Sequence, residues 1–205
     1  MDKIFRTKSG INISRNVKYL EDERDITSII EKLDTKYGVY LSSGVEFPDR
    51  YSQWDFGIVD PPLMFTGSYR ELIIEALNQR GELLLGFFKS LFTKNEDFEL
   101  VKDSKELIKI KIIENNKIFM EEERSLQPSI FSPLRKIIEE FEGIQDQHLG
   151  LYGAFAFDLI YQFEKPKKKI DRLEKSDVLK LFFPDEIFIY DRKKELMIKY
   201  NYFFS

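Results

Sequence analysis

The sequence predicts an α+β fold built from antiparallel sheet, with helices packed on one face. Hydrophobic residues make up 42% of the 205 residues and aromatic residues 15%, which is ample for a packed core. Short runs in which apolar and polar residues alternate follow one another through tight turns, as antiparallel strands do. Three other segments carry apolar residues at helical spacing.

The first 41 residues predict a hairpin, a helix and a strand. Two short extended runs within residues 4–14 flank a Lys-Ser-Gly turn, which predicts a hairpin at a sheet edge. Asp25 is placed to cap a helix, and the helix leads through Gly38 into a buried strand at residues 39–41. The inward face of this helix is expected to carry Ile26, Ile29, Ile30 and Leu33.

Residues 38–62 predict two strands joined by a polar loop. Ser42-Ser43-Gly44 ends the first strand, and a polar turn with Pro48, Asp49 and Arg50 follows. The second strand is expected to alternate through Trp54, Phe56 and Ile58 up to Pro61-Pro62. Trp54 is predicted to be a core or interface aromatic residue. The loop is either an ordinary solvated hairpin loop or a binding site.

The middle of the chain predicts strands around a helix. Residues 68–77 are ambiguous between helix and strand, and we favour a strand. After a turn at residues 78–81, a helix is expected to face inward with Leu83, Leu84, Phe87, Phe88 and Leu91. Residues 98–114 predict one or two strands that place Ile108, Ile110 and Ile112 on one side of the pleat.

The last third predicts a helix followed by strands. Ser132-Pro133 is expected to start the helix, with Leu134, Ile137, Ile138 and Phe141 facing inward. Residues 149–157 predict a strand in which small residues such as Gly153 allow close packing. The basic run at residues 165–169 is expected to be a solvated loop, and strands are predicted at residues 178–183, 186–190 and 196–202.

Composition excludes several classes of partner. The formal net charge is −4 with both signs interspersed, so we expect no nucleic-acid binding. No stretch approaches the roughly 20 apolar residues of a membrane span, so we expect no membrane association. The chain has no cysteine, which excludes disulfides and thiolate metal sites and fits a cytoplasmic location.

Residues with catalytic chemistry are scarce. His148 is the only histidine, and a lone histidine next to an apolar strand is more often structural than catalytic. The sequence has no nucleophile elbow and no nucleotide-binding glycine motif, and its clustered glutamates resemble solvated surface. We therefore predict no catalytic residue, no metal ligand and no cofactor in this chain.

Six segments, in order along the chain, resemble anthranilate synthase component I, particularly the form fused to its glutamine amidotransferase. They are T-K-S-G-I-N-I-S-R (7–15), L-S-S-G-V-E-F-P-D-R-Y-S-Q-W-D-F-G-I-V-D-P-P (41–62), A-L-N-Q-R-G (76–81), F-S-P-L-R (131–135), G-L-Y-G-A-F-A-F-D-L-I-Y-Q-F-E (150–164) and F-P-D-E-I-F-I-Y-D (183–191). The resemblance implies that residues 1–205 are a single N-terminal domain of that enzyme.

The resemblance also implies partners. Enzymes of this family convert chorismate to anthranilate with ammonia, which a glutamine amidotransferase subunit or domain delivers, and with Mg²⁺. Their catalytic site lies in a C-terminal chorismate-binding domain that this chain would lack, so we expect it to be inactive alone. Apolar surface left exposed where that domain belongs can also support a homodimer.

The resemblance further implies a regulatory site for L-tryptophan. Many members carry L-L-E-S where this chain has Tyr40, Leu41, Ser42 and Ser43, so Ser42 replaces a glutamate. A zwitterionic indole amino acid needs an acceptor for its ammonium, a donor for its carboxylate and an apolar slot. The candidate tryptophan-binding residues are Leu41, Ser42, Ser43, Arg50, Tyr51 and Ser52.

Two alternatives stay open at this point. The first is that the chain is the N-terminal domain of a sister chorismate enzyme, aminodeoxychorismate synthase or aminodeoxyisochorismate synthase, although R-Y-S-Q-W-D and V-D-P-P favour anthranilate synthase. A free-standing amino-acid sensor without catalysis is the other alternative.

Overall fold

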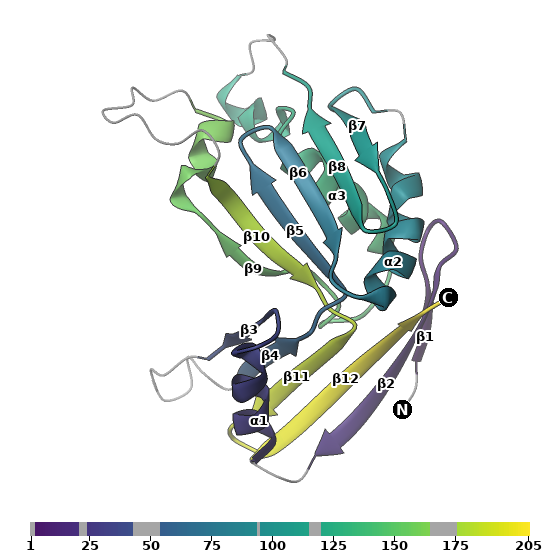
Figure 1. Cartoon of the computed structure of the whole chain (residues 1–205), viewed down its shortest axis with the longest axis vertical. Coiled ribbons are helices and arrows are strands. Elements are labelled where there is room, and N and C mark those ends of the chain that lie inside the picture. The colour runs from purple at the N-terminus through teal and green to yellow at the C-terminus, as the bar shows by residue number, and fades with distance from the viewer. Residues whose placement is uncertain (1–2, 21–23, 43–53, 94, 115–119, 165–175) are drawn as a thin grey trace. The chain divides into compact units, whose positions relative to one another are not determined.

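The computed structural model describes residues 3–20, 24–42, 54–93, 95–114, 120–164 and 176–205 (Figure 1). The chain divides into two compact units, which we describe separately. The first comprises Met1–Pro62, Gly143–Tyr152 and Phe182–Ser205, and the second comprises Leu63–Glu142 and Gly153–Leu181. Each sheet has six strands and is antiparallel, so the predicted α+β class is confirmed.

The first sheet draws its strands from both ends of the chain. Its strand order is β1-β2-β12-β11-β4-β3. The elements of this unit are β1 (Lys3–Arg6), β2 (Asn12–Leu20), α1 (Arg24–Leu33), β3 (Gly38–Leu41), β4 (Trp54–Val59), β11 (Glu186–Asp191) and β12 (Leu196–Phe204). The predicted hairpin of β1 and β2 is confirmed, as are the predicted strands β11 and β12. β2 runs on to Leu20 because it pairs with β12 from Ile13↔Phe204 to Leu20↔Met197.

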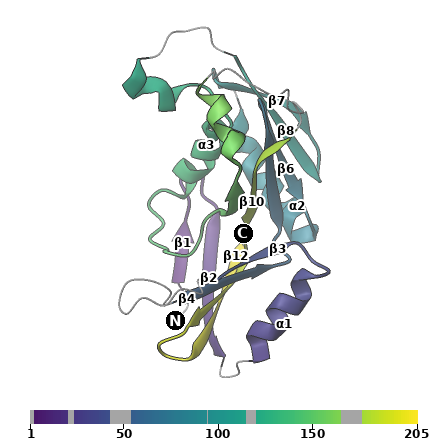
Figure 2. The ribbon, with the colours of Figure 1, turned by 90° about the vertical axis from the view of Figure 1, so that its left-hand side faces the viewer.

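Helix α1 covers one face of this sheet next to β3 and β4 (Figure 2). Its Ile29 is buried against Phe188 and Met197, and Gly57 of β4 allows the close approach because Ile29 Cγ2 lies 3.2 Å from where a Cβ would stand. The prediction that Ile30 faces inward is wrong, since its side chain is exposed. The predicted capping by Asp25 lies outside the described side chains.

The strands β3 and β4 differ from the prediction in burial. β3 is an edge strand and only half-buried, because a single strand neighbours it. In β4 the polar Asp55 is buried, whereas Trp54 is 55% exposed and is therefore not a core residue. β4 lies inside the sheet and is packed on both faces, so simple alternation does not apply to it. The interface role of Trp54 stays a prediction.

The second sheet has the order β7-β8-β6-β5-β10-β9. Residues 68–77, which the sequence left ambiguous, form mainly a strand, as we favoured. The isoleucines of β8 are buried, as predicted. The elements are β5 (Leu63–Ser68), β6 (Glu71–Ala76), α2 (Gln79–Lys89), η1 (Ser90–Phe92), β7 (Phe98–Asp103), β8 (Leu107–Ile112), η2 (Glu121–Leu126), α3 (Phe131–Phe141), β9 (Tyr152–Phe155), η3 (Phe157–Gln162) and β10 (Asp177–Phe183).

Helices α2 and α3 begin earlier than the sequence predicted. The Asn78 side chain accepts a hydrogen bond from the Gly81 backbone N–H at 3.1 Å, so the expected turn is the cap and first turn of α2. α3 starts at Phe131, ahead of Ser132-Pro133, and the Ser129 hydroxyl accepts from the Phe131 N–H. The inward placement of Leu83 and Ile138 is wrong, because both side chains are exposed.

Strand β9 is shorter than predicted and gives way to the helix η3. The close packing expected at Gly153 is confirmed. A Cβ there would lie 2.1 Å from the Lys180 carbonyl oxygen, and the φ of +159° also disfavours a side chain. This edge strand therefore needs glycine at position 153.

Candidate functional site

A buried carboxylate lies where β3 and β11 end and β4 begins. Asp55, in β4, is only 4% exposed. The pairings Leu41↔Phe56 and Asp191↔Trp54 bring the end of β3 and the turn after β11 to the same place. Tyr40, Ser42 and Arg192 surround the carboxylate as a result.

Hydrogen bonds connect four side chains into one group, which we call the Asp55 ring: Tyr40, Ser42, Asp55 and Arg192. Arg192 donates from Nε to both carboxylate oxygens of Asp55 at 3.1 and 3.2 Å, and from Nη2 to Asp55 Oδ2 at 3.0 Å. The same Nη2 donates to Ser42 Oγ at 2.8 Å. Tyr40 donates its phenol proton to Asp55 Oδ2 at 3.0 Å.

The charges within the ring balance. Burial, together with the hydrogen bond to Asp55 and the charge of Asp55, raises the pKa of Tyr40 to about 12, against the opposing effects of Arg192 and Ser42. The phenol therefore stays protonated at neutral pH and acts as a donor. One carboxylate and one guanidinium leave the ring neutral.

The turn after β11 is fixed from the other side by Asp191. Its carboxylate accepts from the backbone N–H groups of Lys193 and Lys194 at 3.1 and 3.2 Å. Burial acts to raise the pKa of Asp191, but these hydrogen bonds and the charge of Lys194 outweigh it and lower the pKa. Asp191 thus fixes the turn that carries Arg192.

A second buried carboxylate in the same unit has a structural role. The Asp146 side chain is 0% exposed and accepts from Arg15 Nη1 at 2.6 Å and from the Tyr202 hydroxyl at 2.9 Å. It also accepts from the backbone N–H groups of His148 and Leu149. These bonds and Arg15 lower the pKa of Asp146 against the effect of burial, which raises it. Asp146 thereby fastens residues 143–152 to β2 and β12.

The single histidine lies among aromatic rings. The His148 ring centroid is 4.6 Å from that of Tyr200 and 6.1 Å from that of Phe56, which stacks on Tyr152 at 4.9 Å. Burial lowers the pKa of His148, and the nearby Asp146 charge only partly opposes this. Packing accounts for these contacts, and the ring is neutral at neutral pH.

The comparison with known proteins identifies a relative that covers nearly the whole chain. No protein-family model matches. A protein named anthranilate synthase from Azospirillum brasilense is 35% identical over 187 residues, which is 91% of this chain. The chain is a relative of anthranilate synthase. It spans 25% of the length of that anthranilate synthase.

The resemblance to anthranilate synthase gave six candidate residues for a tryptophan site. The structure describes two of them. Leu41 ends β3 with an exposed side chain, and Ser42 lies in the Asp55 ring. Ser43, Arg50, Tyr51 and Ser52 lie outside the described residues. The sequence reasoning missed Asp55, because alternation placed it outside the core, and Arg192, because it lies in an Asp-Arg-Lys-Lys turn between two predicted strands.

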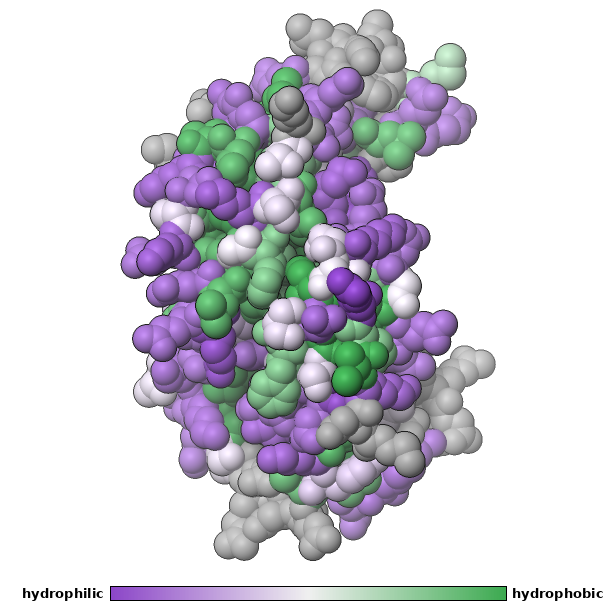
Figure 3. Space-filling model, turned by 90° about the vertical axis from the view of Figure 1, so that its right-hand side faces the viewer, coloured by the Kyte–Doolittle hydropathy of each residue, from purple (hydrophilic) through white to green (hydrophobic). Residues whose placement is uncertain are grey.

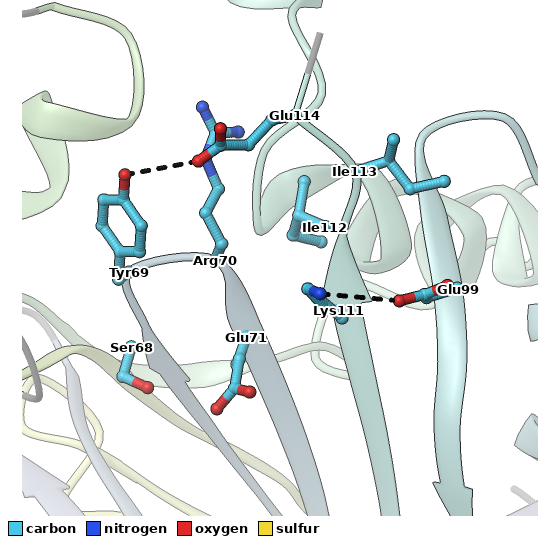
Figure 4. Close-up of a pocket in the computed structure, with 9 residues that line it drawn as sticks. All are labelled: Ser68, Tyr69, Arg70, Glu71, Glu99, Lys111, Ile112, Ile113 and Glu114. Atoms are coloured by element: carbon cyan, nitrogen blue, oxygen red, sulfur yellow. Dashed lines mark hydrogen bonds and ion pairs between the residues drawn. The ribbon is translucent and has the colours of Figure 1, made fainter.

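The second unit has an open pocket of about 750 Å³ at the turn between β5 and β6 (Figure 4). Several of its charged side chains lie close to a partner of opposite charge or to a hydroxyl. Lys111 Nζ is 3.9 Å from Glu99 Oε1, and the Tyr69 hydroxyl is 3.5 Å from Glu114 Oε1. The lining mixes both charges, and we assign it no role in anthranilate synthase. The lining residues are Ser68, Tyr69, Arg70, Glu71, Glu99, Lys111, Ile112, Ile113 and Glu114.

Over the described residues, no group of three or more His, Cys, Asp or Glu side chains is placed to hold a metal ion. In the same residues, no helix combines the length and the apolar character that crossing a membrane requires.

Large apolar side chains are exposed in both units. Ile4 and Phe203 are examples in the first unit, and Phe155 and Phe157 are examples in the second. On the face shown in Figure 3, hydrophobic residues are interspersed with hydrophilic ones. The homodimer expected from such surface stays a prediction.

Proposed function

We propose that this chain is part of an anthranilate synthase and serves as its regulatory and structural portion in tryptophan biosynthesis, in the cytoplasm. The observation that carries the proposal is the 35% identity across 91% of the chain. The complete enzyme would form anthranilate from chorismate, with Mg²⁺ and with ammonia from a glutamine amidotransferase subunit or domain. The chorismate site would belong to a partner domain, since a substrate with two carboxylates bound through Mg²⁺ needs concentrated acidic ligands and cationic groups.

The proposed regulatory ligand is L-tryptophan, bound at the end of β3. A serine hydroxyl has one proton and two lone pairs. Ser42 Oγ accepts from Arg192, so one lone pair is left to accept a second hydrogen bond. The ammonium of an amino acid is a matching donor, and the exposed Leu41 side chain supplies apolar surface for an indole.

Because the Asp55 ring is neutral, we expect it to bind the ammonium of tryptophan less strongly than a carboxylate would. A glutamate at position 42 would offer a carboxylate to the ammonium, and such charge-assisted hydrogen bonds are roughly twice as strong as neutral ones. Ser42 offers only a hydroxyl oxygen. We therefore expect tryptophan to inhibit less strongly than it does in members with the L-L-E-S pattern.

A chimeric enzyme tests both parts of the proposal. This chain replaces the matching segment of the Azospirillum brasilense anthranilate synthase, and anthranilate fluorescence is followed with chorismate, glutamine and Mg²⁺ over a range of tryptophan concentrations. We expect anthranilate to form and tryptophan to inhibit its formation. The unchanged Azospirillum brasilense enzyme is the control.

Two outcomes would contradict the proposal. A chimera that elutes and unfolds like its parent enzyme yet makes no anthranilate would contradict the assignment to an anthranilate synthase. An active chimera that tryptophan does not inhibit, in parallel with an inhibited parent, would contradict the regulatory site alone.

A further inference from the structure

We propose that Arg192 is a positioning residue for the tryptophan site, which holds Ser42 against Asp55 and thereby sets the sensitivity of the enzyme to tryptophan. This inference rests on the proposed function. Arg192 is far from Ser42 in sequence, and the pairing of β4 with both β3 and β11 brings the two residues together.

A single nitrogen of Arg192 bridges the two residues. Nη2 donates to Ser42 Oγ at 2.8 Å and to Asp55 Oδ2 at 3.0 Å. Ser42 follows the last residue of β3, and the pairing of β3 with β4 extends only to Leu41↔Phe56. Beyond the strand pairing, the side chain of Arg192 therefore fixes the Ser42 hydroxyl.

The anchor of this bridge is rigid. Asp55 lies within β4, whose neighbours in the sheet are β3 and β11. Arg192 Nε contacts both carboxylate oxygens of Asp55, so the planar guanidinium has one orientation relative to the sheet. A fixed guanidinium plane fixes the direction of its Nη2–H bonds, and with them the position of Ser42 Oγ.

An ion pair whose only role is to neutralise Asp55 does not need the contact with Ser42. A lysine at position 192 can supply a positive charge to Asp55, but its ammonium lacks the planar fork that serves two partners at once. Arg192→Lys therefore keeps the charge and removes the bridge. This variant separates positioning from simple charge balance.

The test uses the chimeric enzyme with Arg192→Lys, Ser42→Ala and both changes together. The tryptophan concentration for half-inhibition is measured for each variant, relative to the uninhibited activity of that same variant. The matched control is Lys194→Gln, which removes a cation from the same turn. Lys194 is 70% exposed and its Nζ lies 3.5 Å from Asp191 Oδ2.

We expect Arg192→Lys to raise the half-inhibitory concentration about tenfold, as the loss of one charge-assisted hydrogen bond does. The half-inhibitory concentration of the double variant should not exceed the higher of the two single-variant values. Both changes break the same Nη2–Oγ bond, so their effects do not add. Lys194→Gln should leave the half-inhibitory concentration unchanged. Unaltered inhibition in Arg192→Lys, or full additivity with Ser42→Ala, would overturn the inference.

A second measurement keeps the inference testable apart from the proposed function. If the active chimera ignores tryptophan, the regulatory proposal fails, but the hold of Arg192 on Ser42 is still measured by NMR on the chain itself. Arg192→Lys should shift the Ser42 amide and Hβ signals clearly more than Lys194→Gln does. Equal shifts in the two variants would show that Arg192 does not position Ser42.

Discussion

Replacing Asp146 by asparagine should strongly destabilise the first unit. The side chain is 0% exposed and accepts hydrogen bonds from Arg15, Tyr202, His148 and Leu149. Asparagine keeps the shape, but it removes the charge and turns an N–H group toward these donors. Breaking a buried ion pair by removing one partner costs about 3–5 kcal/mol. That is a large share of the roughly 5–15 kcal/mol by which a domain is stable.

The measurement is urea unfolding followed by the fluorescence of Trp54. Trp54 is the only tryptophan of the chain and lies in the first unit, so its signal reports on the unit that contains Asp146. The control is Asp60→Asn in the same unit, which weakens an exposed ion pair with Lys36 at 3.6 Å. Such exposed pairs contribute about 0–1 kcal/mol.

The pH dependence gives an independent check. The folded chain lowers the pKa of Asp146, so the unfolded state takes up a proton first as the pH falls. The contribution of Asp146 is therefore complete above about pH 4, the ordinary range of an aspartate, and is lost as the pH falls through the lowered pKa. The stability difference between wild type and Asp146→Asn should shrink at acidic pH. A difference below about 1 kcal/mol at neutral pH, equal to that of Asp60→Asn, would refute the reasoning.

Three further predictions follow from glycine, histidine and serine positions. Gly153→Ala should lower the free energy of unfolding by more than about 2 kcal/mol, because its Cβ would lie 2.1 Å from the Lys180 carbonyl oxygen. Gly86→Ala in α2, where nothing lies within 4 Å, should raise it by about 0.5–1 kcal/mol, and circular dichroism melts compare the two. The C2–H signal of His148 should titrate with a pKa below 6.5 in an NMR pH series. The unfolded state then binds more protons between this lowered pKa and 6.5, so the free energy of unfolding rises with pH in that range. A midpoint at or above 6.5 would contradict the argument from burial. In the chimeric enzyme, Ser42→Glu should lower the half-inhibitory tryptophan concentration about tenfold, whereas the neutral Ser42→Gln should not. Equal effects of the two variants would show that the charge at position 42 does not strengthen tryptophan binding.

The sequence predicts the strands well because period-two patterns and turns are local signals. The strands β8, β10, β11 and β12 follow from such patterns alone. The sequence predicted the buried faces of the helices less well. Ile30, Leu83 and Ile138 fit a helical stripe, yet each lies beyond the part of the stripe that the sheet covers. Which part is covered depends on where each helix crosses its sheet, and this is a tertiary property.

The candidate site shows the same division. Ser42 and Leu41 came from a family resemblance in one short segment, whereas Asp55 and Arg192 become neighbours only through the pairing of β4 with β11. Residues 55 and 192 are far apart in sequence, and a polar residue in a strand is ordinarily assigned to solvent. A buried carboxylate that needs a distant cation leaves no local pattern.

The order of strands in the first sheet has a consequence for how the chain folds. β12 lies between β2 and β11, and its last residues pair with the beginning of β2 at Phe204↔Ile13. During synthesis, β1 and β2 are made long before β12, the strand that pairs with β2 along most of its length. The second unit holds an unbroken stretch of sequence, Leu63–Glu142, that is available much earlier. Contacts between residues so distant in sequence slow folding, so completion of the first sheet is expected to be the late step.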